Sequence, residues 1–218
     1  MAPEALLSAY TEQEELEKLK AWWKNYGPAL LVGVVIGVVL LFGNKYWKEH
    51  KERQRQEASG LYEQLLDAQR RGDAQAVRSA GAKLVQDYDA TPYAGMAALA
   101  VARAAAEAGD LAGARTQLEW VIAHGRDPAV QHVARLRLGR VLLAKGEIDA
   151  VLTLATVKEQ AGFRSEYLEL KGDALLAAGR RDEALGAYQE ALRQARPGTR
   201  SATLGMKLDD LAAAAKPQ

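Results

Sequence analysis

A glycine followed by a charged residue recurs at nearly constant intervals along the last two thirds of the chain. The four glycines are Gly72, Gly109, Gly146 and Gly179, which are separated by 37, 37 and 33 residues. Periods of this length are typical of stacked helix pairs, in which a glycine in the left-handed conformation ends one helix before the chain reverses. The spacing therefore predicts a solenoid of antiparallel helix pairs.

Residues at fixed distances from these glycines are small and apolar, as close helix crossings require. Five positions after each glycine lie Val77, Ala114, Val151 and Ala184. Seven positions before the last three glycines lie Ala102, Gly139 and Gly172. The final unit also carries Tyr188 and Ala191 at the spacing of a tetratricopeptide repeat, and Pro197 follows it. Because the earlier units match less well, we expect a tetratricopeptide-like solenoid with irregular units over residues 72–218.

Apolar periodicity, together with the positions of proline and glycine, predicts where the helices lie. They are expected over residues 92–107, 111–124, 128–144, 148–159, 165–178, 182–194 and 200–215. The last is amphipathic through Leu204, Met206, Leu208 and Leu211, and we expect it to cap the open end of the solenoid. Residues 48–71 are expected to form a helical stem. No strand is expected, so the fold class is all-α.

A run without charged residues indicates that one helix near the N-terminus crosses a membrane. It comprises the 20 residues from Asn25 to Asn44, and at ~1.5 Å per residue it matches a hydrocarbon core ~30 Å thick. Aromatic residues suited to the two headgroup regions flank it: Trp22, Trp23, Tyr46 and Trp47. We expect a transmembrane helix over residues 25–47, preceded by a short segment over residues 1–24.

Two other interpretations of this run are disfavoured by its flanks. A cleaved signal peptide normally begins with basic residues and ends at small ones, whereas acidic residues precede this run and Tyr46 and Trp47 follow it. A buried helix of a water-soluble domain does not need paired aromatic and lysine flanks. Upstream, Thr11 and Glu14 form a capping-box pattern, which predicts the start of a short amphipathic helix before the membrane.

Gly33 and Gly37 lie four residues apart within the run and leave one helix face without side chains. Such a pair permits close approach of another membrane helix. Glycine is also common in membrane helices for other reasons, so both a packing role and an incidental one stay open.

Composition argues against several classes of function. Lys and Arg total 29 and Asp and Glu 28, which lacks the basic excess typical of nucleic-acid binding. The chain has no cysteine, and its histidines, His50, His124 and His132, have no metal-ligand spacing and are expected at the surface. No phosphate-binding loop or nucleophile motif is present. We therefore expect no enzyme activity, no metal and no cofactor.

Several aromatic residues of the helical region could line a binding surface or belong to the core. They are Tyr62, Tyr88, Tyr93, Trp120 and Tyr167. Aromatic residues at helical spacing are more often buried, so core positions are the favoured interpretation.

Four parts of the chain are similar to one known family: the stretch from Glu15 to Gly27, the segment with Gly33 and Gly37, the Tyr46-Trp47 pair and the tetratricopeptide-like region. Together they resemble the YfgM-like ancillary subunits of the bacterial SecYEG translocon. The resemblance implies a single-pass protein of the bacterial inner membrane, with a cytoplasmic N-terminus and a periplasmic C-terminal domain. It also implies association with SecYEG and with a PpiD-like membrane-anchored chaperone, and a role in passing translocating polypeptides to periplasmic chaperones.

The basic residues around the run favour the opposite orientation. Three lysines lie within about 20 residues before it, whereas five basic residues follow it: Lys45, Lys48, Lys51, Arg53 and Arg55. The positive-inside rule would keep the larger group in the cytoplasm, although it weakens for long translocated domains. Two hypotheses follow: a non-catalytic translocon subunit that links translocation to periplasmic chaperones, or a membrane-anchored tetratricopeptide scaffold or regulator that faces the cytoplasm.

Overall fold

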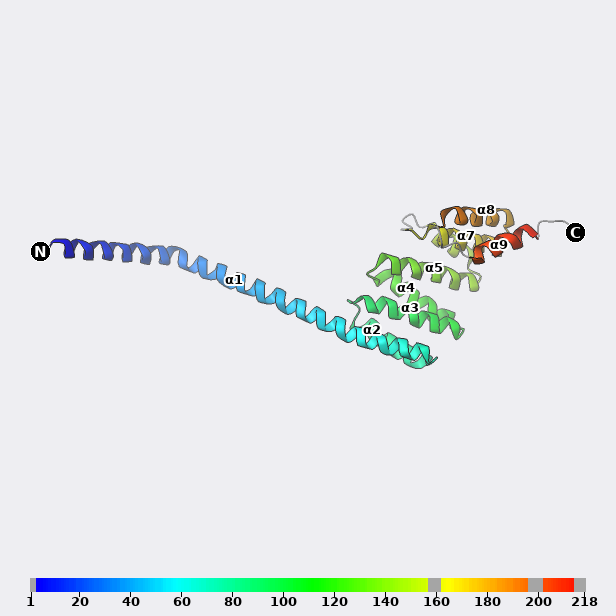
Figure 1. The fold of residues 1–218 in the computed structure, drawn as a ribbon, viewed down its shortest axis with the longest axis horizontal. Coiled ribbons are helices and arrows are strands. Elements are labelled where there is room, and N and C mark those ends of the chain that lie inside the picture. Colours follow the sequence, from blue (N-terminus) through cyan, green and yellow to red (C-terminus); the bar gives the residue numbers. More distant parts are fainter. Residues whose placement is uncertain (1–2, 157–161, 196–201, 214–218) are drawn as a thin grey trace. The chain divides into compact units, whose positions relative to one another are not determined.

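The computed structural model describes the backbone of residues 3–156, 162–195 and 202–213, and all regular structure in these ranges is helical (Figure 1). Side chains of residues 3–15, 29, 32, 34–36, 38, 41, 202 and 212 lie outside the description. The helices are α1 (Pro3–Arg70), α2 (Ala74–Asp87), α3 (Pro92–Glu107), α4 (Leu111–His124), α5 (Pro128–Ala144), α6 (Ile148–Leu154), α7 (Arg164–Ala177), α8 (Arg181–Gln194) and α9 (Ala202–Ala213). The expected all-α fold class is confirmed.

The chain divides into two compact units, Met1–Arg53 and Gln54–Gln218. The first consists of the N-terminal part of α1. Among the described residues, no helix contains a stretch both long and apolar enough to cross a membrane.

Helix α1 begins near the N-terminus and passes through the expected capping box without a break. Its first residue is Pro3, a residue favoured in the first helical turn because it lacks a backbone N–H that would be unpaired there. Thr11 and Glu14 are therefore interior helical residues, and the predicted helix start at Thr11 is wrong. A local capping pattern marks a helix start only where the upstream chain is not already helical.

The second unit begins within α1, whose last turns pack as a helix of the solenoid. Ala58, Leu65 and Ala68 are buried in one cluster with Val77 and Leu84 of α2. The C-terminal half of the expected stem thus supplies the first apolar face against which the following helices stack. Consecutive helices from α2 to α9 pack against each other, and α5 also contacts α3 and α7 (Figure 1).

The four glycine turns share one geometry, as the sequence period predicts. Gly72, Gly109, Gly146 and Gly179 have φ angles between 72° and 78°. Each turn has the same two hydrogen bonds of a Schellman cap: at the first, the N–H of Gly72 donates to the Gln69 carbonyl at 3.1 Å and that of Asp73 to the Ala68 carbonyl at 2.9 Å. A positive φ favours glycine strongly, which explains why glycine recurs at these positions.

The small residues at fixed offsets lie at helix crossings. Val77, Ala114, Val151 and Ala184 are each at most 2 % exposed. A Cβ atom added to Gly139 would overlap the Leu170 side chain, and one added to Gly172 would overlap the Tyr188 ring. These positions therefore allow helices to approach more closely than any larger residue permits.

The predicted bounds match α3, α4 and α5 and differ by one residue at each end from α7, while α8 starts one residue early. Helix α6 ends at Leu154, earlier than expected, and residues 157–159 of the expected helix lie outside the described residues. In the cap α9, Leu204 and Leu211 are buried, but Met206 is 58 % exposed. Its place on the apolar face is taken by Lys207 and Leu208, which the helical period puts between Leu204 and Leu211.

Candidate functional site

A groove of about 380 Å³ lies among α3, α4 and α5 of the second unit. Its apolar wall consists of small and branched residues: Ala102, Ala106, Leu111, Leu118, Val141 and Ala144. Alanines one turn apart on α3 leave this space open, because their side chains do not reach across to α5. We call this feature the α3–α5 groove.

Charged side chains line the rest of the α3–α5 groove. They are Arg103 and Glu107 of α3 and Arg137 and Arg140 of α5. The Arg103 Nε donates to Glu107 Oε1 at 2.7 Å, whereas neither Arg137 nor Arg140 forms an ion pair with any acidic residue that the structure describes. Three arginines and one glutamate give the groove a net charge of +2.

The Arg137 guanidinium lies in an unfavourable electrostatic environment. Its Nη1 donates a long hydrogen bond, 3.4 Å, to the Leu99 carbonyl. Desolvation, followed by repulsion from Arg103 and then Arg140, lowers the pKa of Arg137. The groove thus concentrates positive charge next to an apolar surface, with no counter-charge for Arg137 among the described residues.

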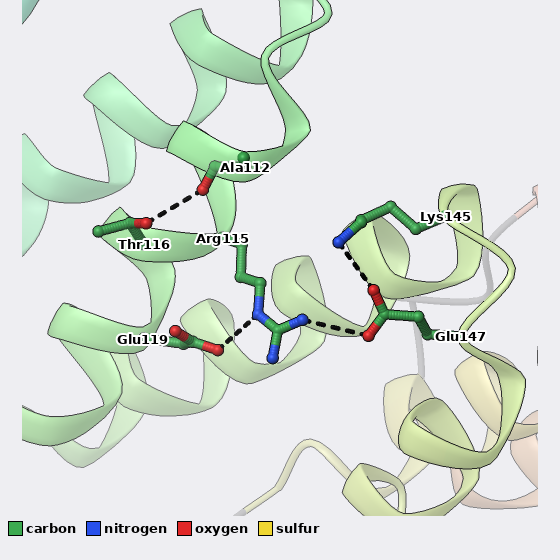
Figure 2. A network of polar contacts seen from close by, with 6 residues as sticks. All are labelled: Ala112, Arg115, Thr116, Glu119, Lys145 and Glu147. Atoms are coloured by element: carbon green, nitrogen blue, oxygen red, sulfur yellow. Dashed lines mark hydrogen bonds and ion pairs between the residues drawn. The ribbon is translucent and has the colours of Figure 1, made fainter.

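A polar network lies beside the groove and joins α4 to the turn between α5 and α6 (Figure 2). Arg115 Nε donates to Glu119 Oε1 at 2.7 Å and its Nη1 donates to Glu147 Oε2 at 3.1 Å. Lys145 Nζ lies 2.8 Å from Glu147 Oε1. The hydrogen bond from Lys145, with the charges of Lys145 and Arg115, lowers the pKa of Glu147. This network fixes the turn that follows groove residue Ala144.

The residues expected to lie at the membrane occur in the first unit, along α1. Trp22, Trp23, Tyr46 and Trp47 are all exposed, and the Lys51 Nζ lies 3.6 Å from the centroid of the Trp47 ring. A Cβ added to Gly33 or Gly37 would meet no atom within 4 Å. No contact inside the described chain therefore requires glycine at either position.

The aromatic residues of the second unit pack against its core, as favoured from the sequence. Tyr167 is fully buried, and Tyr62, Tyr88, Tyr93 and Trp120 are partly buried against the apolar clusters. Tyr62 and Tyr93 have ring centroids 5.6 Å apart, and Trp120 and His124 stack at 5.1 Å. None of these aromatic side chains lines the α3–α5 groove.

The expected surface position is confirmed for His50 and His124 and is wrong for His132. His132 is 5 % exposed, its ring stacks on Phe163 at 5.2 Å, and its Nδ1 lies 3.0 Å from the Tyr167 hydroxyl. A polar side chain on a core-facing position of α5 is tolerated here because a tyrosine hydroxyl satisfies it. Within the described ranges, no group of acidic, histidine or cysteine residues has the arrangement of a metal site.

Sequence reasoning missed the α3–α5 groove. The available signal was the pair Arg137 and Arg140, which lies one helical turn apart on α5 and therefore on one face. What makes the pair part of a site is the packing of α5 beside α3 and Arg103.

Comparisons with known proteins place the chain among similar sequences. Residues 20–213 match the family described as a tetratricopeptide repeat-like domain. A protein of Aggregatibacter actinomycetemcomitans is 35 % identical over 191 residues, which cover 86 % of this chain and 92 % of the relative. One of Haemophilus influenzae is 32 % identical over 181 residues, or 83 % and 88 % of the two chains, and one of Escherichia coli is 29 % identical over 201 residues, or 92 % and 96 %. Each relative is named an ancillary SecYEG translocon subunit.

Proposed function

Since this chain belongs to the family of ancillary SecYEG translocon subunits with a tetratricopeptide repeat-like domain, we propose that it is a non-catalytic subunit associated with the SecYEG translocon. The observation that carries the proposal is the similarity to these relatives over most of both chains. A helical solenoid is consistent with it, because stacked helix pairs present extended surfaces that bind proteins.

We further propose that α1 anchors the protein in the membrane through residues 25–47. Supporting this, Leu30, Leu31, Val39, Leu40 and Phe42 are 46 to 68 % exposed. At about 100° per residue these side chains are distributed around the whole circumference of the helix. A helix that is apolar all round needs an apolar environment, and a lipid bilayer provides one. Trp22, Trp23, Tyr46 and Trp47 would then lie at the two headgroup regions.

Gly33 and Gly37 are the proposed contact for a translocon or chaperone helix within the bilayer. Neither makes a contact with the described part of the chain that requires glycine, so an external helix is a physical reason for them. Gly43 provides a matched control, because a Cβ there also meets no atom and the helical period places it on another face.

In the proposed orientation the N-terminus is cytoplasmic and the helical unit is periplasmic in the bacterial inner membrane. There the helical unit would contact a PpiD-like membrane-anchored chaperone and translocating polypeptides. The orientation follows the resemblance to the YfgM-like subunits and opposes the excess of basic residues after the run.

The test is purification of the tagged full-length protein in mild detergent, followed by detection of SecY, SecE, SecG and any chaperone. We expect the translocon subunits to co-elute, and we expect Gly37→Leu to reduce their yield while Gly43→Leu leaves it unchanged. Absence of all three subunits from the wild-type eluate would refute the association. Equal yields from both variants would refute the glycine contact alone.

The second candidate function is a tetratricopeptide scaffold or regulator that faces the cytoplasm. The specific observation in its favour is the group of five basic residues after the uncharged run, against three before it. A C-terminal fusion to a reporter enzyme that is active only in the periplasm separates the two. Activity supports the translocon subunit, and an inactive, stably expressed fusion supports the cytoplasmic scaffold.

A further inference from the structure

We propose that the α3–α5 groove binds a short polypeptide segment in which an acidic side chain lies among bulky apolar ones. This inference deepens the proposed function, on which it rests only for the source of the segment, which would be a translocating chain. The geometry and the charges of the groove carry the argument.

The apolar wall of the groove sets the first requirement on the ligand. Its volume of about 380 Å³ falls within the ~300–1,000 Å³ range of ligand-binding pockets. Ala106 of α3 and Ala144 of α5 present aliphatic surface at the groove, next to the buried side chains of Ala102 and Val141. Because the small alanines leave the space unfilled, aliphatic or aromatic side chains of a partner can complete the packing.

The charge of the groove sets the second requirement. Arg137 and Arg140 have no acidic partner among the described residues, whereas Arg103 is paired with Glu107. An approaching carboxylate would reduce the repulsion among these guanidinium groups and could accept two parallel N–H···O bonds from one of them. The neighbouring apolar wall strengthens such a contact by excluding water.

A polypeptide satisfies both requirements at once. Helix positions 103, 137 and 140 carry the positive charges, while positions 102, 106, 141 and 144 are apolar, so both helices contribute both kinds of lining. A peptide with mixed apolar and acidic side chains offers a partner for each kind. A small inorganic anion would use the arginines and leave the apolar wall uncovered.

The experiment measures binding of a short fluorescein-labelled peptide of leucine and glutamate, blocked at both ends, by fluorescence anisotropy. The protein is the full chain in nanodiscs of zwitterionic lipid, with empty nanodiscs as the blank. A peptide with glutamine in place of glutamate tests the charge. We expect saturable binding of the acidic peptide and binding of the glutamine peptide weaker on the order of tenfold, as expected for the loss of a charge-assisted contact.

Three protein variants locate the site. Arg137→Gln removes the central guanidinium and should weaken the acidic peptide on the order of tenfold. Arg78→Gln is the matched control, because Arg78 is an exposed arginine of α2 whose side chain donates to Gln75 rather than to a carboxylate. Ala144→Trp fills the groove from an exposed position and should weaken both peptides. Circular dichroism confirms that each variant is folded.

Absence of saturable binding, equal affinity for the two peptides, or equal weakening by Arg137→Gln and Arg78→Gln would each overturn the inference. Unchanged binding to a folded Ala144→Trp variant would overturn it as well. Co-elution of SecY with Arg137→Gln, measured in parallel, keeps the two proposals separate. If the peptide fails to bind while SecY still co-elutes, the groove assignment fails and the proposed function stands.

Discussion

Lys207 of the cap α9 joins it to the preceding helix pair through charge, and its replacement tests how the solenoid is closed. Its Nζ lies 2.8 Å from Glu169 Oε1 and 2.6 Å from Asp173 Oδ1, both on α7. The Tyr188 hydroxyl of α8 donates to the same Asp173 oxygen at 2.7 Å. Lys207→Met keeps most of the apolar stem and removes the cation, which leaves two carboxylates one turn apart without it.

The magnitude follows from the burial of these groups. The side chains of Lys207, Glu169 and Asp173 are 27 %, 18 % and 20 % exposed. Breaking a buried ion pair costs ~3–5 kcal/mol, whereas an exposed pair contributes ~0–1 kcal/mol. This partly buried site lies between, so we expect a loss of about 2 kcal/mol in the free energy of opening α9. That corresponds to about thirtyfold faster hydrogen exchange of the α9 amides.

Native-state hydrogen–deuterium exchange of the full-length protein measures this directly. Lys171→Met is the matched control, because Lys171 is an exposed lysine of α7 that has no ion pair among the described residues. We expect it to change the α9 exchange rates less than about threefold, as for surface substitutions that alter stability by up to ~0.5 kcal/mol. Equal exchange in α9 for wild type and Lys207→Met would refute the reasoning.

The same site predicts a dependence of stability on alkaline pH. Desolvation opposes the charged form of Lys207, but hydrogen bonds to Asp173 and Glu169 raise its pKa overall. A raised pKa means that the stabilisation is complete below the unfolded value of 10.5 and is lost as the pH rises through the folded value. Burial and Asp173 also raise the pKa of Tyr188, which acts in the same direction. Alkaline destabilisation of α9 should therefore be weaker in Lys207→Met than in wild type.

The remaining predictions concern the glycine positions and the polar network. Gly172→Ala should lower the free energy of unfolding, measured by chemical denaturation, by ~1–3 kcal/mol because the new methyl overlaps Tyr188. Gly186→Ala, where a Cβ meets no atom within 4 Å, should raise the free energy of unfolding by ~0.5–1 kcal/mol. Equal effects of the two variants would contradict the close packing of Gly172 against Tyr188. Gly109→Ala should cost ~1–2 kcal/mol because its φ is 78°, and an unchanged denaturation midpoint would exclude that strain. Because the pKa of Glu147 is lowered on folding, its contribution to stability is complete above pH 4.5, the ordinary value of the group, and is lost as the pH falls through the folded pKa. Glu147→Gln should therefore flatten the acid side of a plot of unfolding free energy against pH. A plot parallel to that of the wild type would contradict this.

Most of the helical architecture could be predicted because its signals are local. A positive φ at Gly72, Gly109, Gly146 and Gly179 is a property of four or five consecutive residues, and glycine is the residue that adopts it without strain. Proline in the first turn of α3 and α5 marks their starts in the same way. Helix bounds therefore followed from the sequence within one residue for most elements of the second unit.

The errors occurred where a longer-range effect decides the outcome. Thr11 and Glu14 have the pattern of a helix start, but the helix already extends from Pro3. His132 has no local sign of burial, and the approach of Tyr167, 35 residues later, gives its ring a hydrogen-bond partner in the core. Gly81, which the glycine period does not include, is required because Val101 of α3 packs against it.

The sequence by itself determined the helix type, the turn positions, the period of the repeats and the family of the chain, because propensity, backbone conformation and residue spacing are properties of neighbouring residues. Only the tertiary structure decided which surfaces face each other. The α3–α5 groove forms where α5 packs beside α3, and this packing brings Arg103 and Arg137, distant in sequence, to one site. Lys207 joins the cap to Glu169 and Asp173 for the same reason. Charge clusters and grooves depend on distances between helices, and the packing of side chains in the folded chain sets those distances.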